Sequence, residues 1–114
     1  MIHEGNIVLF RFPQTNQTTG KLRPALVLRK LPGQYEDWMI CMISSQLVQQ
    51  IEGLDEIINI EDMDFKNSGL KVTSLVRASR LAVVSKSFLL GAIGEIPNER
   101  LAKIKASIAE WIKG

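Results

Sequence analysis

Short apolar runs that end in turn residues occupy the chain as far as Ile96, and they constrain its fold more than any other feature. These runs are rich in β-branched and aromatic residues and stop at glycine, proline, asparagine or aspartate, which is typical of β-strands. They predict strands at Asn6–Phe12, Pro24–Arg29, Trp38–Ser44, Glu56–Ile60, one or two strands within Leu70–Val84, and a last strand at Phe88–Ile96. Trp38–Ser44 is apolar on both faces, so we expect it inside the sheet rather than at an edge.

The C-terminal segment "PNERLAKIKASIAEWIKG" changes period. Apolar residues recur at helical spacing in it, namely Leu101, Ile104, Ile108 and either Trp111 or Ile112. Pro97 comes just before them, and proline is favoured at the start of a helix. The preceding segment "EDMDFKNSG", residues 61–69, predicts a loop. Several short strands closed by one helix favour a mainly β fold, a small barrel-like sheet with a C-terminal helix.

Length and composition indicate one compact domain that spans residues 1–114. The single cysteine, Cys41, excludes an internal disulfide, fits a reducing cytosol and is interpreted as a small buried hydrophobe. Cysteine and histidine do not cluster at metal-ligand spacing, so we expect no metal site and no cofactor. The start, "MIHEGNIVLFRFP", resembles neither a signal peptide nor a membrane span, and we expect a cytoplasmic protein.

Charged residues are segregated along the chain although the net charge is only +2. Residues 1–30 hold five basic and one acidic residue, residues 31–64 hold eight acidic and no basic residues, and residues 65–114 hold nine basic and three acidic residues. Segregation of this kind can build a positive face that suits a polyanion such as nucleic acid. The alternative is that folding interleaves the blocks and cancels them. The acidic run Asp55–Asp64 is interpreted as a solvated edge.

Polar side chains interrupt the apolar runs in three places. The three clusters are Lys21 and Arg23 after the turn Thr18-Thr19-Gly20, Ser44, Ser45 and Gln46 where the third strand ends, and Arg77, Ser79 and Arg80 within a later apolar run. Arginine presents a planar fork that matches phosphate oxygens, and a serine hydroxyl can donate to the same phosphate.

Each candidate also has an ordinary explanation. Arg23 can be a solvated surface cation, which on local sequence alone is the commoner case, and Ser44 can bond nearby backbone. Gln46 can be an exposed loop residue. Arg77 is the sharpest of the later signals, because a charged residue between Val76 and Ala78 must face solvent, a partner or a ligand.

These residues lie in blocks that resemble a known family. "KLRPALVL" looks like a (K/R)xRPxxVL element, "EGNIVLFRFPQTN" precedes it, and "MISSQ" and "GLKVTSLVRASRLAVV" followed by "LLGAIGEI" come after it in order. Nearly the whole chain is similar to the MazF/PemK-like toxins of bacterial toxin–antitoxin pairs, and its last block to the PemK-like branch.

The resemblance implies an SH3-like barrel of the MazF, PemK and CcdB type with a C-terminal helix, usually a homodimer. It implies an mRNA interferase, an endoribonuclease that cuts single-stranded RNA without metal and leaves a 2′,3′-cyclic phosphate and a 5′-hydroxyl, and a cognate antitoxin that blocks the groove. Carried over by position, the catalytic residues are Arg23 and Ser44. The RNA-binding residues are Lys21, Gln46, Arg77, Thr19 and Ser79.

The sequence departs from the family pattern at several positions. Serine replaces threonine at Ser44, Ser79 and Arg80 occupy the neighbourhood of an acidic residue found in some members, and Asn6 replaces a common aspartate. Two alternatives therefore stay open. One is a barrel toxin that binds a protein such as gyrase, and the other is a non-catalytic module that binds nucleic acid or an antitoxin-like peptide.

Overall fold

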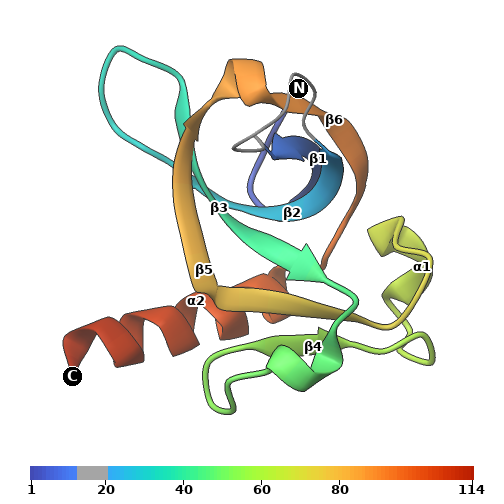
Figure 1. Cartoon of the computed structure of the whole chain (residues 1–114). Helices are drawn as coiled ribbons and strands as arrows, with labels where there is room; N and C mark the ends of the chain where they lie inside the picture. Colours follow the sequence, from blue (N-terminus) through green and yellow to red (C-terminus); the bar gives the residue numbers. More distant parts are fainter. Residues whose placement is uncertain (13–20) are drawn as a thin grey trace.

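The computed structural model describes residues 1–12 and 21–114, which form an antiparallel β-sheet and two α-helices (Figure 1). The strands are β1 (Asn6–Phe12), β2 (Lys21–Lys30), β3 (Asp37–Ser44), β4 (Glu56–Ile58), β5 (Ser74–Ser85) and β6 (Leu89–Glu95). The α-helices are α1 (Phe65–Ser68) and α2 (Asn98–Lys113), and the short 3-10 turns are η1 (Leu47–Gln49) and η2 (Lys86–Phe88).

The six strands follow the order β4-β5-β3-β2-β1-β6, and each neighbouring pair is antiparallel. The sheet curls strongly, so that β1, β2 and β6 arch over one end of the molecule (Figure 1). Because β4 and β6 are its two edges, the sheet is barrel-like without being a closed ring. This architecture confirms the expected mainly β fold with a C-terminal helix.

The predicted strands match the observed ones in number and place, with shifted ends. Asn6–Phe12 is confirmed, and the third strand lies inside the sheet between β2 and β5 as expected. The second strand begins earlier than predicted, at Lys21, and the region 70–84 holds one long strand, β5. Residues 61–69, predicted as a loop, contain the short helix α1. Gly69 follows the helix and adopts the left-handed conformation.

Two apolar clusters lie on opposite faces of β1, β2 and β3. Alternate residues contribute to each cluster, so that Ile7 and Leu26 face one side whereas Val8 and Val27 face the other. Helix α2 covers the first side with its buried stripe of Leu101, Ile104 and Ile108. The strands between the clusters are therefore anchored on both faces, which holds their ends in fixed positions.

The last turn of α2 extends past the sheet (Figure 1), and Trp111 and Ile112 are both exposed. Both residues lie within α2, as their helical spacing predicted, and the buried stripe of the helix ends at Ile108. Cys41 is fully buried, as expected, and desolvation with a smaller contribution from Asp55 raises the pKa of its thiol. No helix in the described part of the chain has the length and apolar character needed to span a membrane.

Candidate functional site

A cavity of about 730 Å³ opens where β2 begins, where β3 ends and at the middle of β5. It is lined by Lys21, Arg23, Met42, Ile43, Ser44, Ser45, Gln46, Gln49, Arg77 and Arg80. The fold therefore brings together residues from all three polar clusters of the sequence. Of the other candidates, Ser79 is not among the lining residues, and Thr19 lies outside the described residues.

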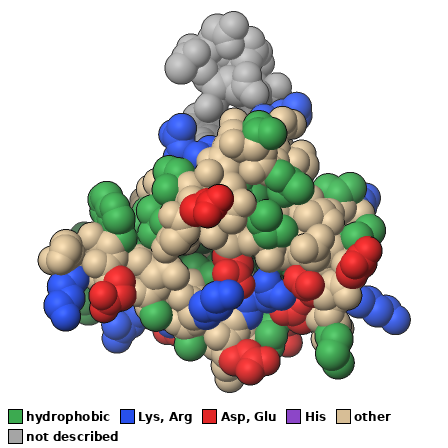
Figure 2. Space-filling view, turned by 90° about the horizontal axis from the view of Figure 1, so that it is seen from below, with side chains coloured by type: hydrophobic (Ala, Val, Ile, Leu, Met, Phe, Trp, Pro, Cys, Tyr) green, Lys and Arg blue, Asp and Glu red, His purple; other side chains and the backbone are tan. Residues whose placement is uncertain are grey.

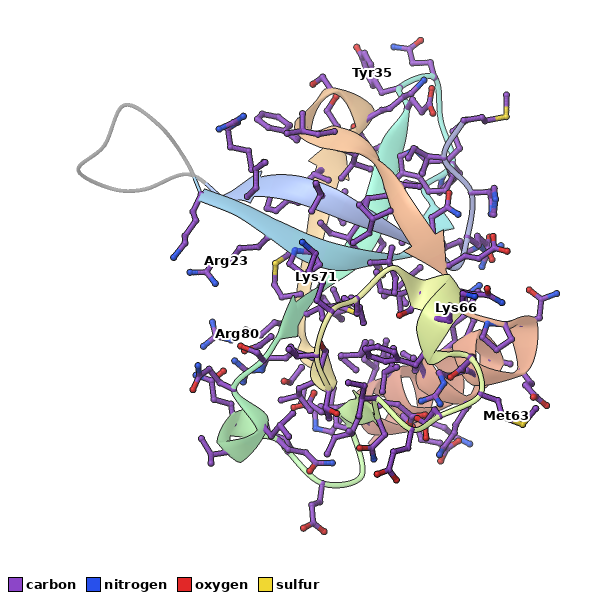
Figure 3. The ribbon with its side chains drawn as sticks, turned by 90° about the vertical axis from the view of Figure 1, so that its right-hand side faces the viewer. Arg23, Tyr35, Met63, Lys66, Lys71 and Arg80 are labelled. Atoms are coloured by element: carbon purple, nitrogen blue, oxygen red, sulfur yellow. The ribbon has the colours of Figure 1, made fainter. Side chains whose placement is uncertain are left out.

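Arg23 is exposed near the start of β2, opposite Phe10 of β1. Proline restricts the residue before it to extended backbone, so Pro24 favours the strand conformation at Arg23. The strands on either side of β2 in the sheet are anchored in the core, so β2 itself is held rigidly. The Arg23 side chain therefore extends from a fixed backbone position at the mouth of the cavity. Figure 3 shows Arg23 and Arg80 on the same side of the molecule, and both line the cavity.

Ser44 is the last residue of β3, and its Oγ accepts a hydrogen bond of 3.0 Å from the backbone N–H of Gln46. The local backbone contact weighed in the sequence analysis is thus present. It does not use the hydroxyl hydrogen, because an accepting hydroxyl keeps its own hydrogen to donate. Ser44 can therefore hold the turn at residues 44–46 and still donate to a ligand in the cavity.

A β-bulge in β5 turns two arginines toward the same cavity. Met42 of β3 lies opposite Arg77, whereas the preceding Cys41 lies opposite Leu81, so residues 78–80 have no partner on β3. In a regular strand, residues three apart face opposite sides of the sheet. The bulge changes this alternation, and Arg77 and Arg80 both line the cavity.

Asp55 holds the bulge in place. Its carboxylate is buried and accepts hydrogen bonds from the backbone N–H of Ser79 at 3.0 Å, from the Ser79 hydroxyl at 3.2 Å and from the backbone N–H of Ile51 at 2.9 Å. It therefore supplies an acceptor for a backbone group that the bulge removes from the ladder. The RNA-binding role of Ser79 stays a prediction, and its hydroxyl already donates to Asp55.

Gln49 in η1 holds the side chain of Arg77. Its Oε1 accepts a hydrogen bond of 3.1 Å from Arg77 Nη1. Arg77 Nε is buried and has no hydrogen-bond partner among the described residues. A buried donor without a partner is costly, and such groups occur where a ligand supplies the acceptor.

Three carboxylates of the acidic block are paired with one cation of α2, away from the cavity. Arg100 of α2 contacts Asp64 at 2.7 Å, Asp62 at 2.9 Å and Glu56 at 3.2 Å. The expectation of a solvated acidic edge was therefore wrong in part, since Asp55 is buried and these three carboxylates are bound by one guanidinium. Acidic and basic side chains lie next to one another on the face seen in Figure 2.

The cavity keeps its positive charge as a result. None of the ion pairs within residues 1–12 and 21–114 involves one of its four cations, and none of the described residues that line it is acidic. These cations are Lys21, Arg23, Arg77 and Arg80. Around α2, folding thus places basic side chains beside acidic ones and their charges cancel, whereas a positive surface remains at the cavity. Both alternatives of the sequence analysis therefore occur, a positive face in one place and cancellation of charges in another.

Sequence reasoning missed Gln49 as a lining residue and Asp55 as a support, and it placed Ser45 and Arg80 in the polar clusters without giving either a role. Regular alternation would place Arg80 on the face opposite Arg77, so its position in the cavity depends on the bulge. Asn6 takes no part in this cavity. It is buried, its Oδ1 accepts the backbone N–H of His3 at 2.9 Å, and it holds the N-terminal turn.

Fold and site together define a small barrel-like β protein with a cationic cavity. A family model for the PemK-like, MazF-like toxin of type II toxin–antitoxin systems matches residues 3–112. The chain therefore belongs to the PemK-like, MazF-like toxin family.

Solved structures have the same fold at low sequence identity. One is an endoribonuclease in complex with its cognate antitoxin from a mycobacterial species, with a TM-score of 0.68, 14% identity, and coverage of 99% of this chain and 96% of that chain. Another is MazF from Deinococcus radiodurans, with a TM-score of 0.62, 19% identity, and coverage of 97% and 96%. No curated protein sequence matches this chain.

Proposed function

We propose that this protein is a toxin endoribonuclease, an mRNA interferase that cleaves single-stranded RNA in the cavity at Arg23. The observation that carries the proposal is the convergence of four cations and the Ser44 hydroxyl on one cavity in a chain of the MazF-like family. A cationic cavity attracts the phosphates of RNA, and the fold similarity to an endoribonuclease supports the same assignment.

The proposed chemistry uses the RNA's own 2′-hydroxyl. Its oxygen forms a bond to the adjacent phosphorus while the bond from phosphorus to the 5′-oxygen breaks, the 2′-proton leaves to solvent, and the 5′-oxygen takes up a proton. The products are a 2′,3′-cyclic phosphate and a 5′-hydroxyl. The protein's part is to align the attacking oxygen and to stabilise negative charge on the phosphoryl oxygens.

Five residues of the cavity have roles in this proposal. Arg23 forks onto the scissile phosphate and Ser44 donates its hydroxyl hydrogen to a non-bridging oxygen. Arg77 holds a neighbouring phosphate or base, and Lys21 and Gln46 bind RNA next to it. Charge stabilisation is the larger contribution of Arg23, because a guanidinium is a poor proton donor in water.

The proposed reaction is independent of metal. Four cations line the cavity and would repel a divalent cation, whereas they supply the positive charge that a metal provides in other nucleases. No group of three or more histidine, cysteine, aspartate or glutamate residues in the described ranges could hold a metal ion.

Two protein partners belong to the proposal. The first is a cognate antitoxin that covers the cavity, supported by the antitoxin complex of the mycobacterial relative. The second is another copy of the chain. Large apolar side chains on β5, η2 and β6 are exposed, as a self-complementary dimer surface requires, and they are Leu81, Val83, Phe88, Leu90 and Ile93.

The test is incubation of the purified protein with a defined single-stranded RNA in the presence of EDTA, followed by mapping of both new ends. We expect fragments with a 2′,3′-cyclic phosphate and a 5′-hydroxyl, and no cleavage at a site that carries a single 2′-deoxy substitution. RNA that stays intact, while the protein forms a complex with gyrase, would establish the rival function. Cleavage that requires added Mg²⁺ would overturn the proposed mechanism.

A further inference from the structure

A second cavity, of about 320 Å³, adjoins the first and is also lined by Arg23. It shares one wall with the first cavity, formed by Arg23 and residues 43–46. The rest of its lining is mainly apolar and comprises Leu9, Leu22, Pro24, Gly69, Leu70, Lys71, Val72, Ser74 and Ile93. A phosphate bound at Arg23 would therefore adjoin both a polar, cationic cavity and a cavity with a mainly apolar lining.

Close packing of two backbone segments fixes the outer wall of the second cavity. Gly69 follows α1 with a φ of +74°, and a Cβ there would lie 2.1 Å from the carbonyl oxygen of Ile93. A Cβ on Gly94 would lie 2.3 Å from the backbone carbon of Ser68. Only glycine permits this approach of residues 67–70 to β6. The wall at residues 69–72 is thus preformed.

Side-chain hydrogen bonds hold the same wall from both ends. Ser68 is fully buried, and its Oγ accepts the backbone N–H of Leu70 at 3.1 Å. Ser74 donates its hydroxyl to the carbonyl oxygen of Val72 at 2.8 Å. Leu70 and Val72 consequently present apolar surface to the cavity from a backbone that is fixed on either side.

A nucleobase has the chemistry that this cavity accepts. A base in single-stranded RNA has no pairing partner and can turn out of the stack, and its flat face gains free energy when it packs against apolar side chains. The volume is at the small end of ligand pockets, which suits one nucleoside rather than two. The exposed cation at the rim, Lys71, is placed on the loop after α1, and both it and Arg23 line the cavity (Figure 3).

We propose that the second cavity binds the base of the nucleotide adjacent to the phosphate at Arg23, and that Lys71 pairs with the next phosphate along the strand. The cavity then determines which nucleotide is accepted beside the cut. This inference rests on the proposed endoribonuclease function and adds the specificity-determining residues Leu70, Lys71 and Val72 to it.

The experiment compares wild type with Val72→Trp, which fills the cavity from an exposed position, and with Lys71→Gln. Lys66→Gln is the matched control, because Lys66 is an exposed lysine on α1 that lines neither cavity. Cleavage is measured on RNA oligonucleotides that vary at each position beside the cut. Binding is measured by fluorescence anisotropy on the same oligonucleotides with a 2′-deoxy linkage at the cut site.

Val72→Trp should reduce the preference for one nucleotide position beside the cut by about tenfold or more. Lys71→Gln should weaken binding several-fold and lower the slope of log affinity against log salt by about 0.7. Lys66→Gln should behave as wild type. If wild type cleaves RNA and Val72→Trp keeps its nucleotide preference, this inference is overturned while the proposed function stands. If wild type cleaves none of the oligonucleotides, the proposed function fails, and this inference fails with it.

Discussion

Gln49 Oε1 accepts a hydrogen bond of 3.1 Å from Arg77 Nη1, although the two residues lie 28 positions apart in the chain. The contact joins η1, which follows the strand that carries Ser44, to the bulged strand β5. It restricts a long side chain that would otherwise lose conformational freedom when it binds a ligand. Gln49 is therefore a positioning residue, and its removal should affect the reaction through Arg77.

We predict that Gln49→Ala lowers kcat/KM for RNA cleavage by about tenfold, since a hydrogen bond to a charged group contributes about 1.5 kcal/mol or more. Gln50→Ala is the control, because Gln50 is the neighbouring glutamine and lines neither cavity. In the Arg77→Ala background, Gln49→Ala should have little further effect. Full additivity of the two substitutions would show that Gln49 does not act through Arg77.

Asp55 should support both stability and activity. Asp55→Ala removes the acceptor of two backbone N–H groups and one hydroxyl, so we expect the free energy of unfolding to fall by about 1–3 kcal/mol. RNA cleavage should fall as well, even under conditions where the variant remains folded, because the bulge places Arg77 and Arg80 in the cavity. Urea denaturation and cleavage of the same samples provide the measurements.

A comparison with Ser79→Ala separates the two contributions of Asp55. This variant keeps the backbone N–H of Ser79 as a donor and loses only the hydroxyl contact of 3.2 Å. We expect it to retain most of the stability and most of the cleavage. A large loss of RNA binding in a fully folded Ser79→Ala sample would instead give Ser79 a direct contact with RNA.

Arg23 and Ser44 should differ in the size of their effects. Loss of one well-placed donor to the transition state costs on the order of 10²–10³ in rate, and we expect this loss for Arg23→Ala with the fold intact. Ser44→Ala should cost less, because a neutral hydroxyl forms a weaker hydrogen bond to phosphate than a guanidinium does. Single-turnover cleavage at saturating enzyme measures both. Unchanged cleavage by folded Arg23→Ala would remove the mechanism, and a larger loss for Ser44→Ala would reverse the two roles.

The strands could be predicted from sequence because β-branched and aromatic runs bounded by turn residues determine them locally. The three polar clusters could be found for the same reason, since charges stand out within apolar runs. The bulge at residues 78–80 could not be predicted, because it exists only in the register between β5 and β3. Gln49 and Asp55 carry no local signal either, and their partners on β5 lie 28 and 24 positions away.

The short helix α1 was missed for a related reason. Its end depends on Gly69 and Gly94, each of which permits a backbone contact with a segment distant in the sequence. A glycine within a strand sequence, as at Gly94, indicates only a bend or a bulge. We predict that Gly94→Ala destabilises the protein by about 1–3 kcal/mol, because the added methyl would lie within 2.4 Å of three backbone atoms of Asn67 and Ser68. Gly91→Ser is a useful contrast, because that position has open space but a φ of +134°, so only backbone strain acts. Thermal denaturation should show the larger loss for Gly94→Ala.

Arg100 should be the main electrostatic support of the fold outside the cavity. Its side chain is 16% exposed and contacts Glu56, Asp62 and Asp64, so Arg100→Ala would leave these carboxylates without their shared cation. We expect a loss of about 2 kcal/mol in the free energy of unfolding, below the cost for a fully buried pair because some contact with water remains. Lys103→Ala, on the same helix but 70% exposed, should change it little.

The effect of Arg100→Ala should depend on pH in a defined direction. The backbone N–H of Asn59 lowers the pKa of Asp62, and hydrogen bonding and charge from Arg100 lower it further. A carboxyl whose pKa is lower in the folded protein than its ordinary pKa stabilises the fold when the pH is above that ordinary pKa. This contribution is lost as the pH falls through the pKa of the folded state. The difference in stability between wild type and Arg100→Ala should therefore be largest near neutral pH and should shrink in acid, as measured by urea denaturation at both. A difference that stays constant into acid would show that Arg100 acts through packing of its side chain rather than through these charges.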